Sequence, residues 1–309
     1  MAAKRLDIGG QAVIEGVMMR SPKAMAIAVR RPSGQVAVKE EPWRSLSQRL
    51  KFLRWPVLRG AVVFIEALVN GIQALSYSAN QALEEEEGGP LSPWAIGLTI
   101  VLALGLAMVI FVAAPHLISL ASGLGVRTLG FHLIDGLLKV AFFVAYILGI
   151  SLLKDVRRMF MYHGAEHMSI HAYEAGQPLT VESARHWPTL HPRCGTAFIL
   201  LVLVISIIFF ALVFPFLPRP EGSRWLVNLF FLLVKVVLML PIAGLAYELI
   251  RQAGRRSQAW WVRVVIWPGL LLQRLTTRKP TDDQIEIALT ALKSALKIED
   301  LTQRGQVRP

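Results

Sequence analysis

Residues 196–217 read TAFILLVLVISIIFFALVFPFL, and this stretch decides the fold of the chain. It holds no charged side chain, and about 20 apolar residues in a helix suffice to cross the hydrocarbon core of a bilayer. In lipid every backbone polar group must be satisfied within the protein, which a helix achieves inside one segment. The stretch therefore predicts a transmembrane helix.

Three further runs are long and apolar enough to cross a bilayer, at 94–121, 131–153 and 225–250. Trp94 and Trp225 open two of them, as tryptophans often do at the membrane interface. Of the 309 residues 54% are hydrophobic and only 17% are charged, whereas soluble domains carry about 25% charged residues. We expect an all-α membrane protein with about four transmembrane helices, whose first partner is the lipid bilayer.

The placement of positive charge predicts the orientation. The net charge is +12, and the basic residues concentrate before residue 60, between the second and third spans, and after residue 250. The other two connections, at 123–128 and 218–224, are short. The positive-inside rule therefore places both termini and the middle segment in the cytoplasm. Anionic lipid headgroups account for the excess charge, so we expect no nucleic-acid partner.

Four spans divide the chain into membrane and cytoplasmic regions. Residues 57–83 are predicted to form an amphipathic helix at the interface, because this moderately apolar segment contains Arg59, Glu66 and Asn70. A crossing by this helix alone would change the parity of the spans. The other regions are a cytoplasmic N-terminal region with a glycine-rich motif (1–56), spans one and two (94–153), a cytoplasmic motif loop (154–195), spans three and four (196–250) and a cytoplasmic C-terminal region (251–309).

Three short elements are predicted outside the spans. Met25–Arg30 and Gln35–Lys39 flank a Pro-Ser-Gly turn, which predicts a small N-terminal β-hairpin. Trp260–Leu272 is too short to span and predicts an interfacial anchor that ends at its Pro-Gly pair. Residues 281–298 have apolar positions at helical spacing and predict an amphipathic helix with a threonine cap.

The segment between spans two and three concentrates side chains that bind metals. It holds five of the seven histidines and the only cysteine, which also excludes an internal disulfide. It begins YHGAEHMSIHAYE at 162–174 and ends HPRCGT at 191–196. His163 and His167 are four residues apart, so on a helix they share one face and can chelate one ion.

Glu166 completes a His-x-x-Glu-His pattern, the reversed form of the zincin signature. In that pattern the glutamate is the natural general base for a metal-bound water. Imidazole and carboxylate ligands suit a divalent metal, with zinc as the first choice. The third ligand stays open among Glu174, His191 and Cys194, while His171 extends the same helical face.

Arg193 and Cys194 have alternative roles. Arg193 could hold an anionic group of a substrate or pair with a carboxylate of the same segment. Cys194 could bind the metal or act as a nucleophile. His186 lies in a polar turn and is expected at the surface.

Two polar features lie outside this segment. In the motif IGGQAVIEG at 8–16, glycines permit close backbone approach. Its Gln11 and Glu15, with Arg20 beyond it, could reach a site, or the motif could be only a turn leading into a strand. Asp135 and Lys139 lie one turn apart in span two and are expected to neutralise each other. The histidines of the first two spans, His116 and His132, are expected to pack in the bundle or at its interface.

Four motifs together resemble the YqhQ-like family (DUF1385) of bacterial membrane proteins. They are GGQAVIEGVMMRSP at 9–22, YHGAEH at 162–167, HPRCGT at 191–196 and PGLLLQRLTTRKP at 268–280. The family has no assigned function and is labelled metal-dependent on its motifs. The resemblance covers nearly the whole chain and implies a multi-pass protein of the bacterial plasma membrane with a cytoplasmic motif region. Met168 and Ala197 stand where lysine and serine are usual.

The sequence thus predicts a metal-dependent enzyme that hydrolyses a membrane-associated substrate at the cytoplasmic face, with Glu166 and Arg193 as catalytic residues. The alternative is a membrane regulator or assembly factor with a structural metal and a protein partner. A transporter is a third possibility, opposed by the scarcity of ionisable residues in the spans. An open position on the metal distinguishes the enzyme from the structural site.

Overall fold

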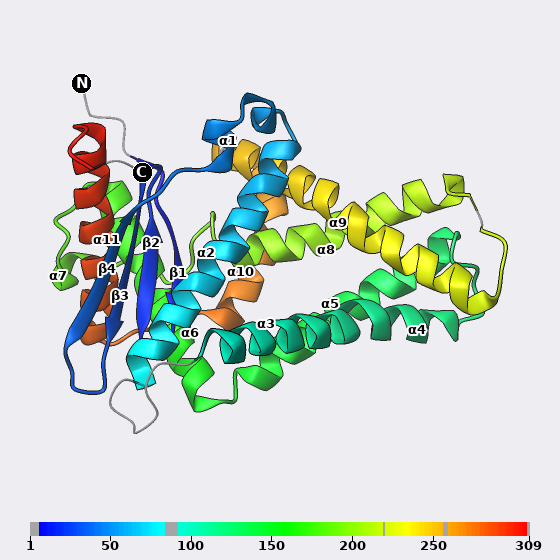
Figure 1. Cartoon of the computed structure of the whole chain (residues 1–309), viewed down its shortest axis with the longest axis horizontal. Coiled ribbons are helices and arrows are strands. Elements are labelled where there is room, and N and C mark those ends of the chain that lie inside the picture. Colours follow the sequence, from blue (N-terminus) through cyan, green and yellow to red (C-terminus); the bar gives the residue numbers. More distant parts are fainter. Residues whose placement is uncertain (1–5, 84–91, 219, 256–258, 308–309) are drawn as a thin grey trace.

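The computed structural model describes residues 6–83, 92–218, 220–255 and 259–307. The ends of the two predicted terminal regions, at 1–5 and 308–309, lie outside the described residues, as do 84–91, 219 and 256–258. A bundle of long helices extends from a layer made of a sheet and helices (Figure 1). Leu6, the first described residue, packs against the core of that layer.

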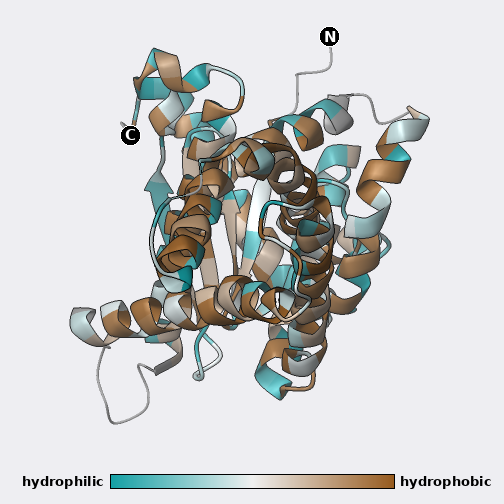
Figure 2. Cartoon of the chain, turned by 90° about the vertical axis from the view of Figure 1, so that its right-hand side faces the viewer, coloured by the Kyte–Doolittle hydropathy of each residue, from teal (hydrophilic) through white to brown (hydrophobic). Residues whose placement is uncertain are grey.

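All four predicted spans form helices of the expected length and hydropathy. Figure 2 looks at the bundle from its far end and shows largely hydrophobic helices. The first span contains a five-residue π-helical segment, η2, and the third ends in a short 3-10 turn, η3. The spans are α3 (Pro93–Met108) continued by η2 (Val109–Ala113) and α4 (Ala114–Leu120), α5 (Leu129–Ile150), α8 (Gly195–Val213) with η3 (Phe214–Phe216), and α9 (Arg224–Arg255).

Helix α2 (Leu58–Leu83) is a fifth candidate span among the described residues. By length and composition it could cross a membrane, where the sequence predicts an interfacial helix. Figure 1 draws it steeply inclined to α5, α8 and α9. It packs on α9 where two glycines meet, since a Cβ at Gly60 would lie 2.8 Å from the Cα of Gly244. An ion pair between Arg59 and Glu248 joins the same two helices.

The N-terminal region forms a four-stranded antiparallel sheet in the order β1-β2-β3-β4. The predicted hairpin is its second half. The first half contains the glycine-rich motif, for which the sequence left open a turn leading into a strand. Glycine is depleted in strands, which hides this half from propensity. The strands are β1 (Gly9–Val13), β2 (Gly16–Arg20), β3 (Ala24–Arg30) and β4 (Val36–Pro42). Between β4 and α2 lie two short turns, α1 (Leu46–Arg49) and η1 (Lys51–Arg54).

Helices cover both faces of the sheet. One face, with Val17 and Met19, packs into a core with α6 (Lys154–Ala175) and α11 (Asp282–Gln303). The other face, with Ile27, packs against α2. This two-sided burial explains why β2 and β3 read as continuous apolar runs rather than alternating ones.

The predicted motif loop, 154–195, is largely helical. It consists of α6, the short α7 (Val181–Ala184) and a turn that returns to α8. Helix α6 ends at Gly176, whose φ of 71° gives the left-handed cap that glycine adopts without strain.

Two C-terminal helices follow the bundle. Helix α10 (Trp260–Thr276) continues through Pro268, so the predicted end at the Pro-Gly pair is wrong. It continues because it packs along α8, where a Cβ at Gly269 would collide with Ala197. The predicted amphipathic helix is α11, and its capping box at Thr281 is present.

Candidate metal centre

Helix α6 carries His163, Glu166, His167, His171 and Glu174 along neighbouring faces. It can do so next to the C-terminal segment because Gly164 has no side chain: a Cβ there would collide with the carbonyl oxygen of Arg278. The backbone N–H of Arg278 in turn donates to the carbonyl of Phe160 at 3.0 Å.

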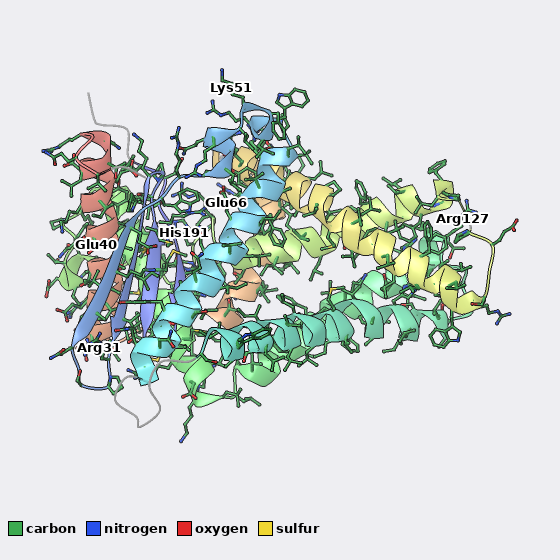
Figure 3. The ribbon with its side chains drawn as sticks, viewed as in Figure 1. Arg31, Glu40, Lys51, Glu66, Arg127 and His191 are labelled. Carbon is green, nitrogen blue, oxygen red and sulfur yellow. The ribbon has the colours of Figure 1, made fainter. Side chains whose placement is uncertain are left out.

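The turn before α8 is held against α10 by Gln273. Its side chain is fully buried, accepts from the His191 N–H at 2.8 Å and donates to the His191 carbonyl at 2.9 Å. Figure 3 labels His191 where the bundle meets the sheet. Sequence reasoning missed Gln273. The available signal was an amide side chain directly after the apolar run 260–272.

A first group of donors consists of His163, His167 and Cys194, with one ligand atom of each within 4.8 Å of the others. His163 Nε2 lies 3.2 Å from Cys194 Sγ, and the imidazole centroids of His163 and His167 are 4.5 Å apart. Cys194 caps α8, and its Sγ accepts from the Thr196 N–H at 3.4 Å. These donors suit one divalent ion.

Each of the two rings uses its Nδ1 for a hydrogen bond to a backbone carbonyl, which leaves its Nε2 for a metal ion. His163 Nδ1 donates to the Thr276 carbonyl at 2.8 Å, and His167 Nδ1 donates to the Thr189 carbonyl. Ligating histidines commonly hold their other nitrogen in this way. His167 is 1% exposed, and its Nε2 has no hydrogen-bond partner among the described residues. Burial lowers the pKa of His167, which favours the neutral form that binds metals.

The other predicted ligands form a second group. His171, Glu174 and His191 likewise bring one ligand atom each within 4.8 Å of the others. The His171 and His191 centroids are 4.6 Å apart, and His191 Nε2 lies 3.4 Å from Glu174 Oε2. Glu174 and His191 thus stand with His171, while Cys194 is the donor beside His163 and His167.

Glu166 is buried, with 5% exposure, between the histidines and the sheet. Burial raises the pKa of its carboxyl, and the nearby His163 and His191 lower it in part. A Cβ at Gly10 would lie 2.8 Å from Glu166 Oε1, so only glycine lets β1 pack here. A backbone hydrogen bond from Gly10 also favours the carboxylate.

The polar residues in and after the glycine-rich motif at 8–16 point away from this site. Glu15 pairs with Arg158 and accepts from the Tyr162 hydroxyl at 3.2 Å. Gln11 lies against α2, and the Arg20 guanidinium stacks 4.5 Å from the Trp43 ring. The motif thus forms a strand, and its backbone at Gly10 lies next to Glu166.

Arg193 lies at the rim of the second group. It pairs with Glu174 and, at 3.2 Å, with Asp7. Its side chain is 38% exposed. This is the carboxylate pairing that the sequence left open.

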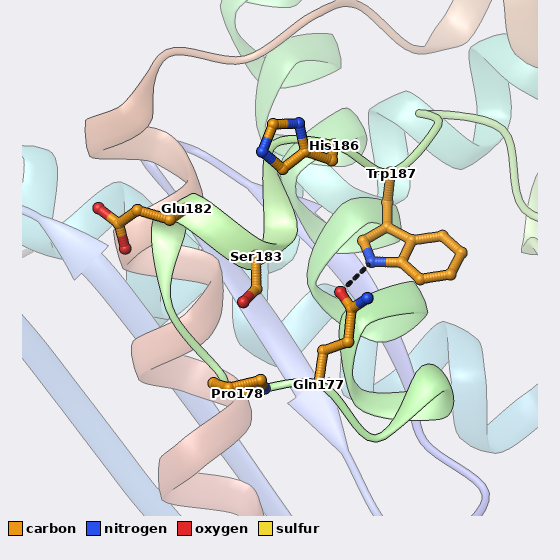
Figure 4. A pocket seen from close by; sticks show the side chains of 6 residues that line it. All are labelled: Gln177, Pro178, Glu182, Ser183, His186 and Trp187. Atoms are coloured by element: carbon orange, nitrogen blue, oxygen red, sulfur yellow. Dashed lines mark hydrogen bonds between the residues drawn. The ribbon is translucent and has the colours of Figure 1, made fainter.

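An open surface cavity of about 500 Å³ lies beyond Trp187 (Figure 4). The Trp187 indole N–H donates to Gln177 Oε1 at 2.9 Å, and its ring stacks on His171 with centroids 5.6 Å apart. His186 lines this cavity and is exposed, as expected. The cavity contains none of the six donors, so Trp187 separates it from the second group.

A separate polar cluster lies inside the bundle. Lys139 Nζ donates to Asp135 Oδ2 at 2.9 Å, which confirms the predicted pair. Lys235 of α9 shares the same carboxylate and lies 3.0 Å from His116 Nδ1. His116 and the neighbouring His132 are buried in the bundle, as expected.

Comparison with known proteins identifies the family of the chain. A family described as "Protein of unknown function (DUF1385)" matches residues 55–298. The chain is 30% identical over 312 residues to "Uncharacterized protein YqhQ" of Bacillus subtilis (strain 168), covering 96% of this chain and 95% of that protein. No solved structure matches. The chain therefore belongs to the DUF1385 family.

Proposed function

We propose that this protein is a metal-dependent hydrolase of the bacterial plasma membrane, with its site at the cytoplasmic face. The observation that carries the proposal is the group His163, His167 and Cys194, in which the rings are oriented by carbonyls and His167 Nε2 is buried without a partner among the described residues. Three protein ligands leave one position for water or substrate, as in catalytic zinc sites.

Each residue has a defined part in this proposal. A divalent ion, with zinc favoured by imidazole and thiolate donors, would supply Lewis-acid activation of water when bound. Glu166 is the proton acceptor, as the glutamate of the reversed zincin pattern. Burial raises the pKa of its carboxyl, so it accepts a proton more readily than an exposed glutamate does. Arg193, half-exposed at the rim, would hold an anionic part of the substrate.

The number of membrane crossings supports the proposed location of the site at one face of the membrane. The sheet precedes α2 and α6 follows α5, yet the sheet and α6 share one hydrophobic core. The two must therefore lie on the same side of the membrane, which requires an even number of crossings between them. The first span and α5 supply two, so we place α2 along the interface rather than across the bilayer.

The same reasoning applies to the second half of the chain. The spans α8 and α9 separate α6 from α11, and these two helices also pack together. Four spans therefore place the sheet, α6 and α11 on one side. The concentration of basic residues in these regions supports a cytoplasmic location for that side. A site where this layer meets the bundle suits a substrate that is itself associated with the membrane.

Metal analysis of the purified protein tests the proposal. His163→Ala and His167→Ala should lose metal at the first group, whereas His186→Ala, the same change at an exposed histidine, should not. Glu166→Gln should keep the metal and lose hydrolysis of ester, phosphodiester and peptide probes presented in micelles. Full activity of Glu166→Gln would refute the role of this carboxylate, and metal-free wild-type protein would refute the proposal.

A structural metal in a regulator is the second candidate. It is favoured by the burial of His167 and Cys194 and by the position of the surface cavity, which none of the ligands lines. X-ray absorption spectroscopy distinguishes the two, because a structural site shows four protein ligands and a catalytic one shows a bound water.

A further inference from the structure

We infer that this chain binds a second divalent metal ion, held by His171, Glu174 and His191 beside the first. The inference deepens the proposed function and rests on it for the role of the first ion. The donor set of two imidazoles and one carboxylate is suited to zinc and to neighbouring first-row metals such as manganese or iron.

The two groups are adjacent and share no residue. Along α6 the donors follow one another at 163, 167, 171 and 174, close to whole helical turns. The returning turn supplies one donor to each group, His191 to the second and Cys194 to the first. The His167 and His191 centroids are 5.6 Å apart, so the four rings form one continuous row.

The second group has supporting contacts of its own. His171 Nε2 donates to the Leu190 carbonyl at 3.0 Å, which leaves its Nδ1 with a free lone pair. Glu174 pairs with Arg193 through Oε1, which leaves Oε2 facing His191. The backbone of His191 is fixed on both sides by Gln273. Such contacts orient ligands before a metal arrives.

The spacing between His191 and Glu174 fits two ligands of one ion. Their facing atoms are 3.4 Å apart, and two ligand atoms at about 2.0–2.1 Å from a tetrahedral zinc are roughly 3.3–3.4 Å apart. His191 Nδ1 now accepts from the Arg193 N–H at 3.3 Å, so the ring proton lies on Nε2. On binding, the ion takes the place of that proton, which moves to Nδ1 by exchange with water, and the long contact to Arg193 is given up.

A purely structural reading treats Glu174, Arg193 and Asp7 as a surface ion-pair network with a neighbouring histidine. That reading accounts for Arg193 but not for His171, whose ring lies between Trp187 and His191. One of its nitrogens is fixed by the Leu190 carbonyl, and the other has no hydrogen bond within the described part of the chain. The two readings differ in metal stoichiometry.

Metal content per chain, measured on the full-length protein in detergent after equilibration with zinc and removal of excess, tests the inference. Wild type and His186→Ala should bind two ions. His171→Ala and Glu174→Gln should each bind one, and the near-isosteric glutamine change guards against an effect of misfolding. One ion in the wild type, unchanged by either variant, would overturn the second site and leave the proposed function standing.

Cobalt substitution identifies which ion remains. The thiolate of Cys194 belongs to the first group only, so the sulfur-to-cobalt charge-transfer band should persist in His171→Ala and Glu174→Gln. It should vanish in Cys194→Ser, while one cobalt per chain remains bound. Loss of the band in His171→Ala would show one shared site and overturn the inference, and a wild type without any metal would overturn the proposed function as well.

Discussion

At the scale of single residues, Glu166 shows how close packing changes the pKa of a side chain. Its carboxyl is enclosed by α6, the histidines and the backbone of β1, and the last of these is possible only because residue 10 is glycine. Burial disfavours the charged form and thereby raises the pKa. A carboxyl in such an environment exchanges protons at a higher pH than an exposed one.

Glu166→Gln should therefore stabilise the metal-free protein at neutral pH. The folded wild type holds its Glu166 proton to a higher pH than the unfolded chain does, so its stability falls as pH rises from about 4.5 through the raised pKa. Glutamine does not titrate, and the advantage of the variant should shrink as the pH is lowered toward 4.5. Melting temperatures of both proteins across pH, in detergent with a chelator, measure this. A constant difference at all pH values would contradict it.

At the scale of elements, contacts between helices depend on small residues. Gly164 lets α6 approach the segment after α10, and this approach brings the Thr276 carbonyl to His163 Nδ1. The same device recurs where α2 meets α9 and where α10 meets α8. The site is therefore positioned by helices that are far apart in the sequence.

Gly164→Ala should destabilise the protein by about 1–3 kcal/mol, because the added methyl group overpacks the contact with the Arg278 carbonyl. It should also weaken metal binding at the first group by displacing Thr276. Gly149→Ala is the matched control, since a Cβ there meets nothing within 4 Å, and alanine favours a helix by up to about 1 kcal/mol. Thermal unfolding and zinc titration of both variants test this prediction. Equal stability and equal zinc affinity of the two variants would refute the importance of the contact at Gly164.

At the scale of the whole molecule, the chain combines a lipid-embedded bundle with a polar layer at one end. The bundle contains its own charged cluster, in which Asp135 is shared by Lys139 and Lys235 and all three are at most 6% exposed. The cluster joins α5 to α9, and three aromatic rings lie within 6 Å of the Lys235 ammonium.

Asp135→Asn should destabilise the bundle strongly, by about 3–5 kcal/mol, because two buried ammonium groups lose their counter-charge. Asp300→Asn removes a carboxylate from an exposed pair with Arg304 and should change stability by less than about 1 kcal/mol. Denaturation in detergent compares the two. A similar small effect for both would show that the buried pairs contribute little.

The placement of α2 along the interface predicts which end of the first span a membrane-impermeant reagent can reach from outside the cell. In a Cys194→Ser background, Ser122→Cys should react with a membrane-impermeant maleimide added to intact cells, since Ser122 follows the first span. Ser92→Cys, at the start of that span, should react only after the cells are opened. Reaction of Ser92→Cys in intact cells would mean that α2 crosses the bilayer.

The sequence by itself determined the elements whose formation depends on local pattern. Length and hydropathy predicted the four bundle spans, periodicity and a threonine cap predicted α11, and a turn signal predicted β3–β4. The pairing of Asp135 with Lys139 followed from their spacing of one helical turn. Each of these signals lies within about 25 residues of sequence, so no knowledge of distant contacts was needed.

Only the tertiary structure decided how distant residues meet. It divided six donors into two groups, added Lys235 to the buried pair, and brought Gln273 to the backbone of His191. It also packed the glycine-rich strand against Glu166 and the sheet against α6, which is the contact from which the proposed parity of the spans is argued. These outcomes depend on packing between segments that are, in one case, more than 150 residues apart in the sequence. Local periodicity carries no information about such contacts.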